Sequence, residues 1–394
     1  TSGFRLVEEC PASGGVKLTI DPEAQGISIE GDLSGAFPLY FSFSKDREAF
    51  LFSTHQRVLA QLVAAAPGMP APDMIGVLQY LRNSYTMAGR SFFSGVSRLQ
   101  AREKLLWSAR EGRLTRSKAK IPEVPDTHSS ALMNFESLWD ELKLSSEIVL
   151  PPQRLALMMS GGWDSRTLLG VACAGKRDNS ELLCYTHGDL QSRELELVAQ
   201  LAQISNSSLH CEPITSEMFS AGNLAEYTLT AETALFPHWF AAGKRLRALG
   251  VSVAQSGVFG ELLGGHYGRS MVLHGLSKMG AVAQELLGLS KPCANMPAAS
   301  LAKLILGQQP FVPWFVSTAG VDRRAVPAEA EIAAECLRQV EASLLEYAAT
   351  GLSEVNELIE WFITEHRGAQ YIAAQARSLQ PHVAISLPFI KPSE

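Results

Sequence analysis

Short apolar runs alternate with turn residues along the first part of the chain. Four of these runs, VKLTI, ISIEG, FPLYFSF and AFLFS, fall between residues 16 and 53. Runs of this length, bounded by glycine, proline and aspartate, predict β-strands. The mixed pattern of 72–92 predicts a helix, and FFSGVSRLQARE followed by KLLWSA predicts another hairpin. We therefore expect a small β-rich domain in the amino-terminal part.

A polar, proline-broken stretch separates this part from the rest. The stretch KAKIPEVPDTHSS ends at Ser130, and a segment of this composition is typical of a linker. The sequence thus predicts one domain over 1–120, a linker over 121–130 and a second domain over 131–394.

Beyond the linker, short apolar strands alternate with helical patterns. The expected strands are RLALMM, ELLCYT, SLHCEPI and VSVAQS, and the helices between them include SRTLLGVACA and SRELELVAQLAQ. Such alternation predicts a parallel sheet whose strands are joined by crossover helices. The expected fold class is α/β, with a doubly wound parallel sheet and a mainly helical region over 275–380.

Composition narrows the class of protein. The chain has 394 residues, of which 46% are hydrophobic, and a formal net charge of -6. No apolar run approaches the ~20 residues of a membrane helix, and the opening TSGFRLVEEC lacks the layout of a signal peptide. We therefore expect a cytoplasmic protein without a membrane partner. Its negative charge also disfavours nucleic acid as a partner.

The segment LALMMSGGWDSRTLLG, residues 155–170, carries the strongest chemical signal. A strand ends at Met159, a helix begins near Ser165, and the turn between them contains Ser160, Gly161 and Gly162. Two glycines let an anion approach the backbone, serine hydroxyls donate to it, and the helix directs its positive end toward it. This order of strand, turn and helix predicts a pyrophosphate-binding loop. The alternative is an ordinary turn without a ligand.

Asp164 adds a carboxylate to this predicted anion site. Such a placement is favourable when a divalent cation lies between the carboxylate and the phosphates, which implies Mg2+. A second glycine-rich turn, SGVFGELLGGHYG, follows the strand VSVAQ, and open α/β sheets bind ligands where their strands end. Glu261 in this turn is the candidate for a second metal ligand. Arg166 is a candidate catalytic residue. His187 is expected on the loop after ELLCYT, where it either contacts substrate or is solvated.

These motifs resemble those of a known family. SGGWDSR, which is typical of PP-loop ATP pyrophosphatases, is followed about a hundred residues later by SGVFGELLGG. Together they are similar to the synthetase domain of asparagine synthetases, β-lactam synthetases and lasso-peptide macrolactam cyclases. GDLSGAFPLYFSFS, LFSTHQRVLA and FFSGVSRLQ look like the later half of that family's glutaminase domain. The family's nucleophilic cysteine has no counterpart here, so the resemblance implies a truncated glutaminase-like domain without glutaminase activity.

The resemblance also implies roles for individual residues. It implies that ATP is bound at the loop and the neighbouring strand ends, by Met158, Ser160, Gly161, Gly162, Asp164, Ser165, Thr186, Ser256 and Gly257. Glu261 stands where the family has a metal-binding aspartate or the glutamate after it, and Val258 stands where several members have a catalytic glutamate. The family uses a lysine further along. Either Lys391 takes its place, or that segment lies outside this sequence, or the activity is lost.

The predicted function is an ATP-dependent, AMP-forming carbon-nitrogen ligase. A substrate carboxylate is adenylated with release of pyrophosphate, and an amine then forms the amide. The carboxylate belongs to a peptide, as in a macrolactam cyclase, or to a small molecule, including a sugar acid amidated with free ammonia. The alternatives are a nucleotide-binding member without turnover and a PP-loop enzyme that acts on tRNA or a nucleotide. A partner protein that delivers substrate and a homodimer are both compatible with the sequence.

Overall fold

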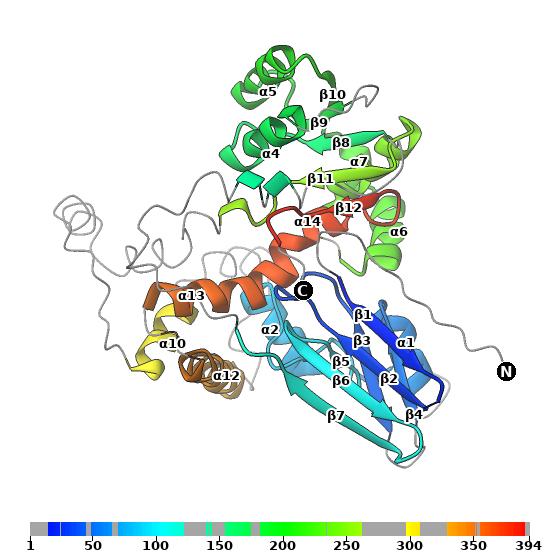
Figure 1. Cartoon of the computed structure of the whole chain (residues 1–394), viewed down its shortest axis with the longest axis vertical. Helices are drawn as coiled ribbons and strands as arrows, with labels where there is room; N and C mark the ends of the chain where they lie inside the picture. Colours follow the sequence, from blue (N-terminus) through cyan, green and yellow to red (C-terminus); the bar gives the residue numbers. More distant parts are fainter. Residues whose placement is uncertain are drawn as a thin grey trace. The chain divides into compact units, whose positions relative to one another are not determined.

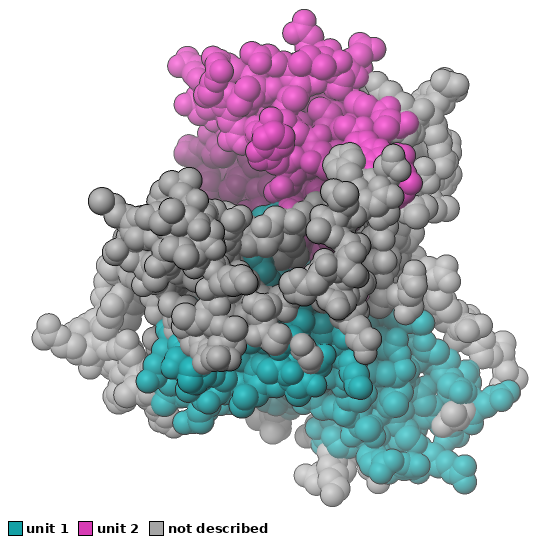
Figure 2. All heavy atoms as spheres, turned by 60° about the vertical axis from the view of Figure 1, so that its left-hand side comes forward, with its two compact units in different colours: residues 1–8, 16–123, 261–371 teal, residues 9–15, 124–260, 372–394 magenta. Residues whose placement is uncertain are grey.

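Two compact units make up the chain (Figure 2). Unit 1 combines 16–123 with 261–371, and unit 2 combines 124–260 with 372–394. The helices of 298–371 thus group with the amino-terminal part, whereas the sequence predicted that all of 131–394 forms one domain. Most of the expected linker lies outside the described residues. The computed structural model describes residues 15–23, 25–44, 49–64, 70–121, 139–140, 142–143, 154–174, 182–233, 235–261, 297–307, 329–350, 352 and 355–390.

Two antiparallel sheets form the amino-terminal part of unit 1. The first has the order β1 (Lys17–Asp21), β2 (Gly26–Glu30), β6 (Glu103–Ser108) and β7 (Arg113–Lys118). The second has the order β4 (Ala49–Ser53), β3 (Tyr40–Ser44) and β5 (Ser97–Arg98). Their apolar side chains share one core, formed by Ile29, Leu39, Phe41, Leu99 and Leu105. Helices α1 (Gln56–Val63) and α2 (Met74–Asn83) follow β4 in the chain.

One local expectation for this part is wrong. FFSGVSRLQARE and KLLWSA were predicted to pair as a hairpin, but β5 pairs with β3 and β6 pairs with β2 and β7. The backbone turns between β5 and β6 at Arg102, which has a left-handed conformation with φ 59°. Because of this turn, β5 and β6 belong to different sheets.

Helices from the other end of the chain complete unit 1. They are α10 (Ala298–Gly307), α12 (Glu329–Ala349) and α13 (Val355–Ile363), which continues into a π-helical segment at Thr364–Ile372. Tyr85, Met87 and Ile121 pack into one buried cluster with these helices, together with residues such as Leu301, Val340, Leu344, Ile359 and Phe362. This shared apolar core is the physical reason why 298–371 groups with the sheets of unit 1.

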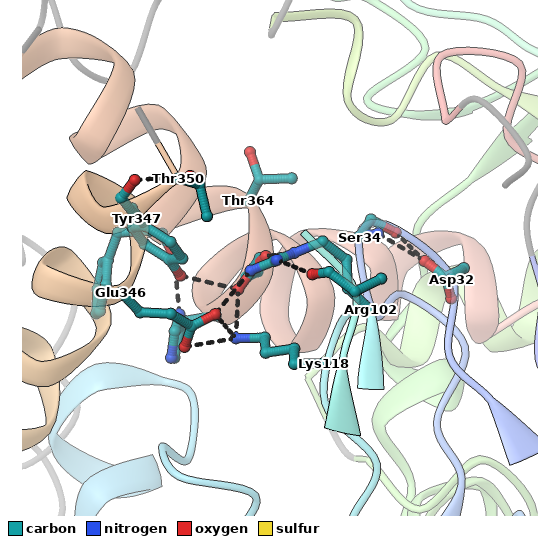
Figure 3. A network of polar contacts seen from close by, with 12 residues as sticks. Asp32, Ser34, Arg102, Lys118, Glu346, Tyr347, Thr350 and Thr364 are labelled. Atoms are coloured by element: carbon teal, nitrogen blue, oxygen red, sulfur yellow. Dashed lines mark hydrogen bonds and ion pairs between the residues drawn. The ribbon is translucent and has the colours of Figure 1, made fainter. Parts of the chain in front are cut away.

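A buried ionic network reinforces the same contact (Figure 3). The guanidinium of Arg102, only 1% exposed, donates through Nε to Oε1 of Glu365 at 2.6 Å. Glu365 lies in the π-helical segment and also accepts from the Tyr347 hydroxyl at 2.8 Å. Lys118 and Glu346 extend the network at its solvent side, 3.0 Å apart. Because Arg102 and Glu365 are both inside the protein, each depends on the other for its charge to be compensated.

Unit 2 is built on a five-stranded parallel sheet, which confirms the expected α/β class with a parallel sheet. Figure 1 shows the strands side by side in the order β10, β9, β8, β11 and β12. Their bounds are Ser208–Pro213, Leu182–Gly188, Leu155–Met158, Val253–Ser256 and Ala384–Ser386, respectively. The last strand was not expected from the sequence.

Helices cover both faces of this sheet. The odd residues of β8, Leu155 and Leu157, pack in one apolar cluster with α4 (Trp163–Ala174) and α5 (Arg193–Ile204). The opposite face of β9 meets α7 (Pro237–Ala248), because the ring of His187 contacts that of Trp239. Helix α6 (Ala221–Ala231) precedes α7. Among the described helices, none combines the length and the apolar character needed to span a membrane.

Candidate active site

The order of strands reverses between β8 and β11. From β8 the chain moves outward to β9 and β10, and then it returns to place β11 on the other side of β8. Ser256 of β11 is in register with Met158 of β8, so both strands end at the same level. A reversal of this kind leaves a crevice beyond the strand ends, and open α/β sheets bind ligands there. Both glycine-rich turns singled out in the sequence begin at this position.

The first turn is shaped by its own serines. The hydroxyl of Ser165, which is 4% exposed, donates to the carbonyl of Ser160 at 2.9 Å and accepts from its backbone N–H at 3.2 Å. The hydroxyl of Ser160 accepts from the N–H of Gly162 at 3.2 Å. The N–H of Gly161 donates to the carboxylate of Glu194 at 3.3 Å. The N–H groups of both glycines therefore donate to side-chain oxygens across a compact loop.

Helix α4 begins directly after the turn, as the sequence predicted. Trp163 is its first residue and is 77% exposed. The guanidinium of Arg166 lies over the Trp163 ring, 4.2 Å from its centre, and its Nε donates to the carbonyl of Gly162 at 3.1 Å. Arg166 thus stabilises the first turn of α4 and places a positive charge beside Gly161 and Gly162.

The second turn packs against the first. A Cβ atom added to Gly260 would lie 2.4 Å from Cγ of Asp164, and one added to Gly257 would lie 3.0 Å from the backbone nitrogen of Ser165. Only the absence of a side chain lets Gly260 come this close. The structure therefore brings Asp164 together with the turn that follows β11, in agreement with the predicted proximity of the two motifs.

Phe259 is a residue of this turn that the sequence did not single out. It is fully buried and has φ 75°, a conformation that is rare for a bulky residue and costs about 1–3 kcal/mol. Burial of its ring holds the backbone in this shape between Val258 and Gly260. Val258 is also buried, at 7% exposure. Glu261 follows Gly260 as the last described residue before 297, and its role as a metal ligand stays a prediction.

The strand ends assigned to the nucleotide are buried. Met158, Thr186 and Ser256 are 5%, 4% and 3% exposed. The backbone of Met159 donates to the carbonyl of Tyr185 at 2.7 Å, which continues the pairing of β8 and β9 beyond the strand. Any contact that these positions make with a ligand would therefore come mainly from the backbone at the rim of the sheet.

His187 lies in strand β9, whereas the sequence predicted that it lies on the loop that follows this strand. Its ring contacts His238 and Trp239 at the start of α7, with ring centres 4.9 and 5.4 Å away. Burial, and secondarily the neighbouring His238, lowers the pKa of His187 to about 4. His187 is therefore neutral at pH 7. Lys391, the remaining candidate, lies outside the described residues.

Metal-binding side chains form no cluster in the described part of the chain, the candidate site included. No group of three or more His, Cys, Asp or Glu residues among the described residues is arranged to hold an ion. Comparison with known proteins adds no assignment, because no protein-family model and no curated protein matches this chain.

Proposed function

We propose that unit 2 binds ATP at the reversal of its strand order and uses it to adenylate a carboxylate, from which an amine then forms an amide. In this proposal the sheet is of the PP-loop ATP pyrophosphatase type, within a family that includes asparagine synthetases. The amino-terminal sheets of unit 1 correspond, in this proposal, to the later half of a glutaminase domain. The amine comes from the substrate or from free ammonia.

Contact between the two glycine turns is the main support for this function. The sequence resemblance pairs a loop after one strand with a turn about a hundred residues later. In the fold, Gly260 closely approaches Asp164 at the reversal of strand order, which is where open α/β sheets bind ligands. A chance resemblance in two short motifs would give no reason for this meeting.

The residues of the loop suit a polyphosphate. The N–H groups of Gly161 and Gly162 already donate to oxygen atoms, and the start of α4 adds a positive helix end. Asp164 and Glu261 would hold magnesium with oxygen atoms, which the ion prefers, and phosphates and water would complete its shell. Bound there, magnesium would supply positive charge beside the departing pyrophosphate.

The reaction has two displacements. A carboxylate oxygen of the substrate attacks the α-phosphorus of ATP, and the bond to pyrophosphate breaks. The amine then attacks the acyl carbon, AMP leaves, and a proton of the amine goes to a base. The chain contributes by orienting the phosphates at Gly161 and Gly162 and by excluding water from the buried strand ends. Val258 offers no proton acceptor, so the proton passes to the substrate or to another group.

Val258 also favours a second candidate function. With a buried valine where several family members have a catalytic glutamate, the unit would bind nucleotide and form no product. Amidation of a sugar acid with ammonia is a variant of the first candidate, and action on tRNA is a weaker alternative because the net charge of -6 offers little attraction for a polyanion.

Calorimetric titration with ATP and magnesium, followed by pyrophosphate exchange with a panel of carboxylic acids, tests the proposal. We expect the parent protein to bind ATP and Asp164→Asn to bind it at least about tenfold more weakly, because the metal loses a charged ligand. Glu226→Gln, on α6 and paired with Lys244, is the matched control and should change nothing. Binding without AMP formation for any acid would select the second candidate, and no binding at all would refute both.

A further inference from the structure

We propose that Glu194 is an internal competitor for phosphate: its carboxylate occupies the position of a phosphate oxygen at the loop and weakens the hold of unit 2 on free pyrophosphate. This inference rests on the proposed function, since it concerns the same loop. It adds a residue that neither the motif nor the resemblance singled out.

A hydrogen bond joins Glu194 to the first glycine turn. Glu194 is the second residue of α5, and its Oε1 accepts from the N–H of Gly161 at 3.3 Å. Helix α5 also packs on the loop at a second point, because a Cβ atom on Gly161 would lie 3.4 Å from Cδ1 of Leu197. Gly161 is one of the two glycines whose N–H groups are expected to bind pyrophosphate.

The carboxylate of Glu194 and a phosphate group both accept hydrogen bonds through negatively charged oxygen atoms. A backbone N–H that donates to a carboxylate oxygen has the same geometry for a phosphate oxygen, and it cannot serve both at full strength. The carboxylate must therefore move away when phosphate arrives, or the two negative charges repel each other. Glu194 is exposed and has a flexible side chain, so it can leave the loop without any change in the backbone.

The charge of Glu194 is not compensated by its helix neighbour. Arg193 pairs with Glu196 instead, through Nη1 and Oε2 at 3.0 Å. Helix α5 thus presents a negative charge to the anion site, opposite in sign to what a phosphate-binding loop would favour. For an enzyme that must release pyrophosphate after each turnover, such a charge speeds the release of product, and magnesium offsets it while the nucleotide is bound.

Titration of inorganic pyrophosphate into the full chain, with and without magnesium, tests this role. Glu194→Gln keeps an acceptor oxygen but removes the charge, and Glu194→Ala removes both. We expect both variants to bind pyrophosphate about tenfold more tightly than the parent in the absence of magnesium. This increase in affinity for pyrophosphate should be smaller when magnesium is present. Glu196→Gln removes a charge from the same turn of α5 without a contact to the loop, and we expect less than about a twofold change.

Three results would overturn the inference. If Glu194→Ala binds pyrophosphate more weakly than the parent does, Glu194 stabilises the binding conformation of the loop. If Glu196→Gln gives the same gain as Glu194→Gln, the effect is one of general charge. If the variants equal the parent, the contact has no influence. Failure of the proposed function gives a different outcome, because then neither the parent nor any variant binds pyrophosphate.

Discussion

The substitution Gly260→Ala, which adds a single methyl group, tests how much the contact between the two turns contributes to stability and activity. In Gly260→Ala the new Cβ atom would stand 2.4 Å from Cγ, 2.5 Å from Cβ and 2.7 Å from Oδ1 of Asp164, whereas ordinary contacts begin at 3.4 Å. Since Cβ of Asp164 is among these atoms, rotation of its carboxylate alone does not relieve the overlap. The carboxylate or the turn must shift by about 1 Å, and overpacking of this kind costs about 1–3 kcal/mol.

The effect on function should exceed the effect on stability. A displacement of about 1 Å in a positioning group lowers a rate on the order of a hundredfold, so we expect pyrophosphate exchange to fall by about that factor while the variant remains folded at 25 °C. Thermal unfolding and ATP titration, measured on the same preparation, separate the two effects.

Gly222→Ala provides the matched control. A Cβ atom at this position in α6 meets nothing within 4 Å, so the change should stabilise the protein by up to about 1 kcal/mol and leave exchange unaltered. If Gly260→Ala binds ATP and exchanges pyrophosphate like the parent, Asp164 does not need its present position, and the reasoning fails.

Two further predictions concern unit 1. Arg102→Met leaves the buried Glu365 without its main partner and should lower the free energy of unfolding by about 3–5 kcal/mol in a urea titration; a loss below about 1 kcal/mol would show that Lys118, 3.4 Å from Glu365, suffices. His366 tests a pH dependence: burial, reinforced by the positive charges of Lys118 and Arg98, lowers its pKa from 6.5 to about 3. Between these pH values the unfolded chain binds a proton that the folded chain does not, so stability falls as pH falls, by up to about 1.4 kcal/mol per unit. His366→Phe should flatten that part of the stability curve, and an unchanged slope would contradict the assignment.

The parallel sheet was accessible to sequence reasoning because its strands are buried on both faces. Runs such as LALMM and LLCYT are continuously apolar, and each is followed by a helical pattern at a regular interval. The strand β12 was missed because Ala384–Ser386 is three residues long and follows a helical region without a βαβ pattern. This short segment forms a strand through its parallel pairing with β11 over three residues.

Unit 1 shows where local patterns fail. The pairing of β5 with β3 depends on the turn at Arg102, a residue type that gives no sign of a left-handed conformation in the sequence. The grouping of α12 with the amino-terminal part of unit 1 depends on contacts across more than two hundred residues, such as that between Gln79 of α2 and Gln339 of α12 at 2.7 Å. No periodicity encodes such pairs.

The candidate site was predicted in its motifs but not in its packing. Asp164 and the turn at Gly257 were identified from residue types, because glycine, serine and aspartate in that order have a clear chemical meaning. Phe259 and Glu194 were not. A buried aromatic residue in a strained turn and a glutamate in a helix look ordinary until the fold places them. The contact of Glu194 with the loop depends on the packing of α5 beside α4, which no local pattern specifies.

The interleaved composition of unit 1 also sets the timing of its folding. Tyr85, Met87 and Ile121 bury their side chains against α12 and α13, which end at residue 363. At a synthesis rate of about 5–20 residues per second, the ribosome needs roughly 15–55 s to go from Tyr85 to the end of α13. Throughout that interval the growing chain exposes apolar side chains that the complete fold buries, so we expect the nascent protein to bind ribosome-associated chaperones.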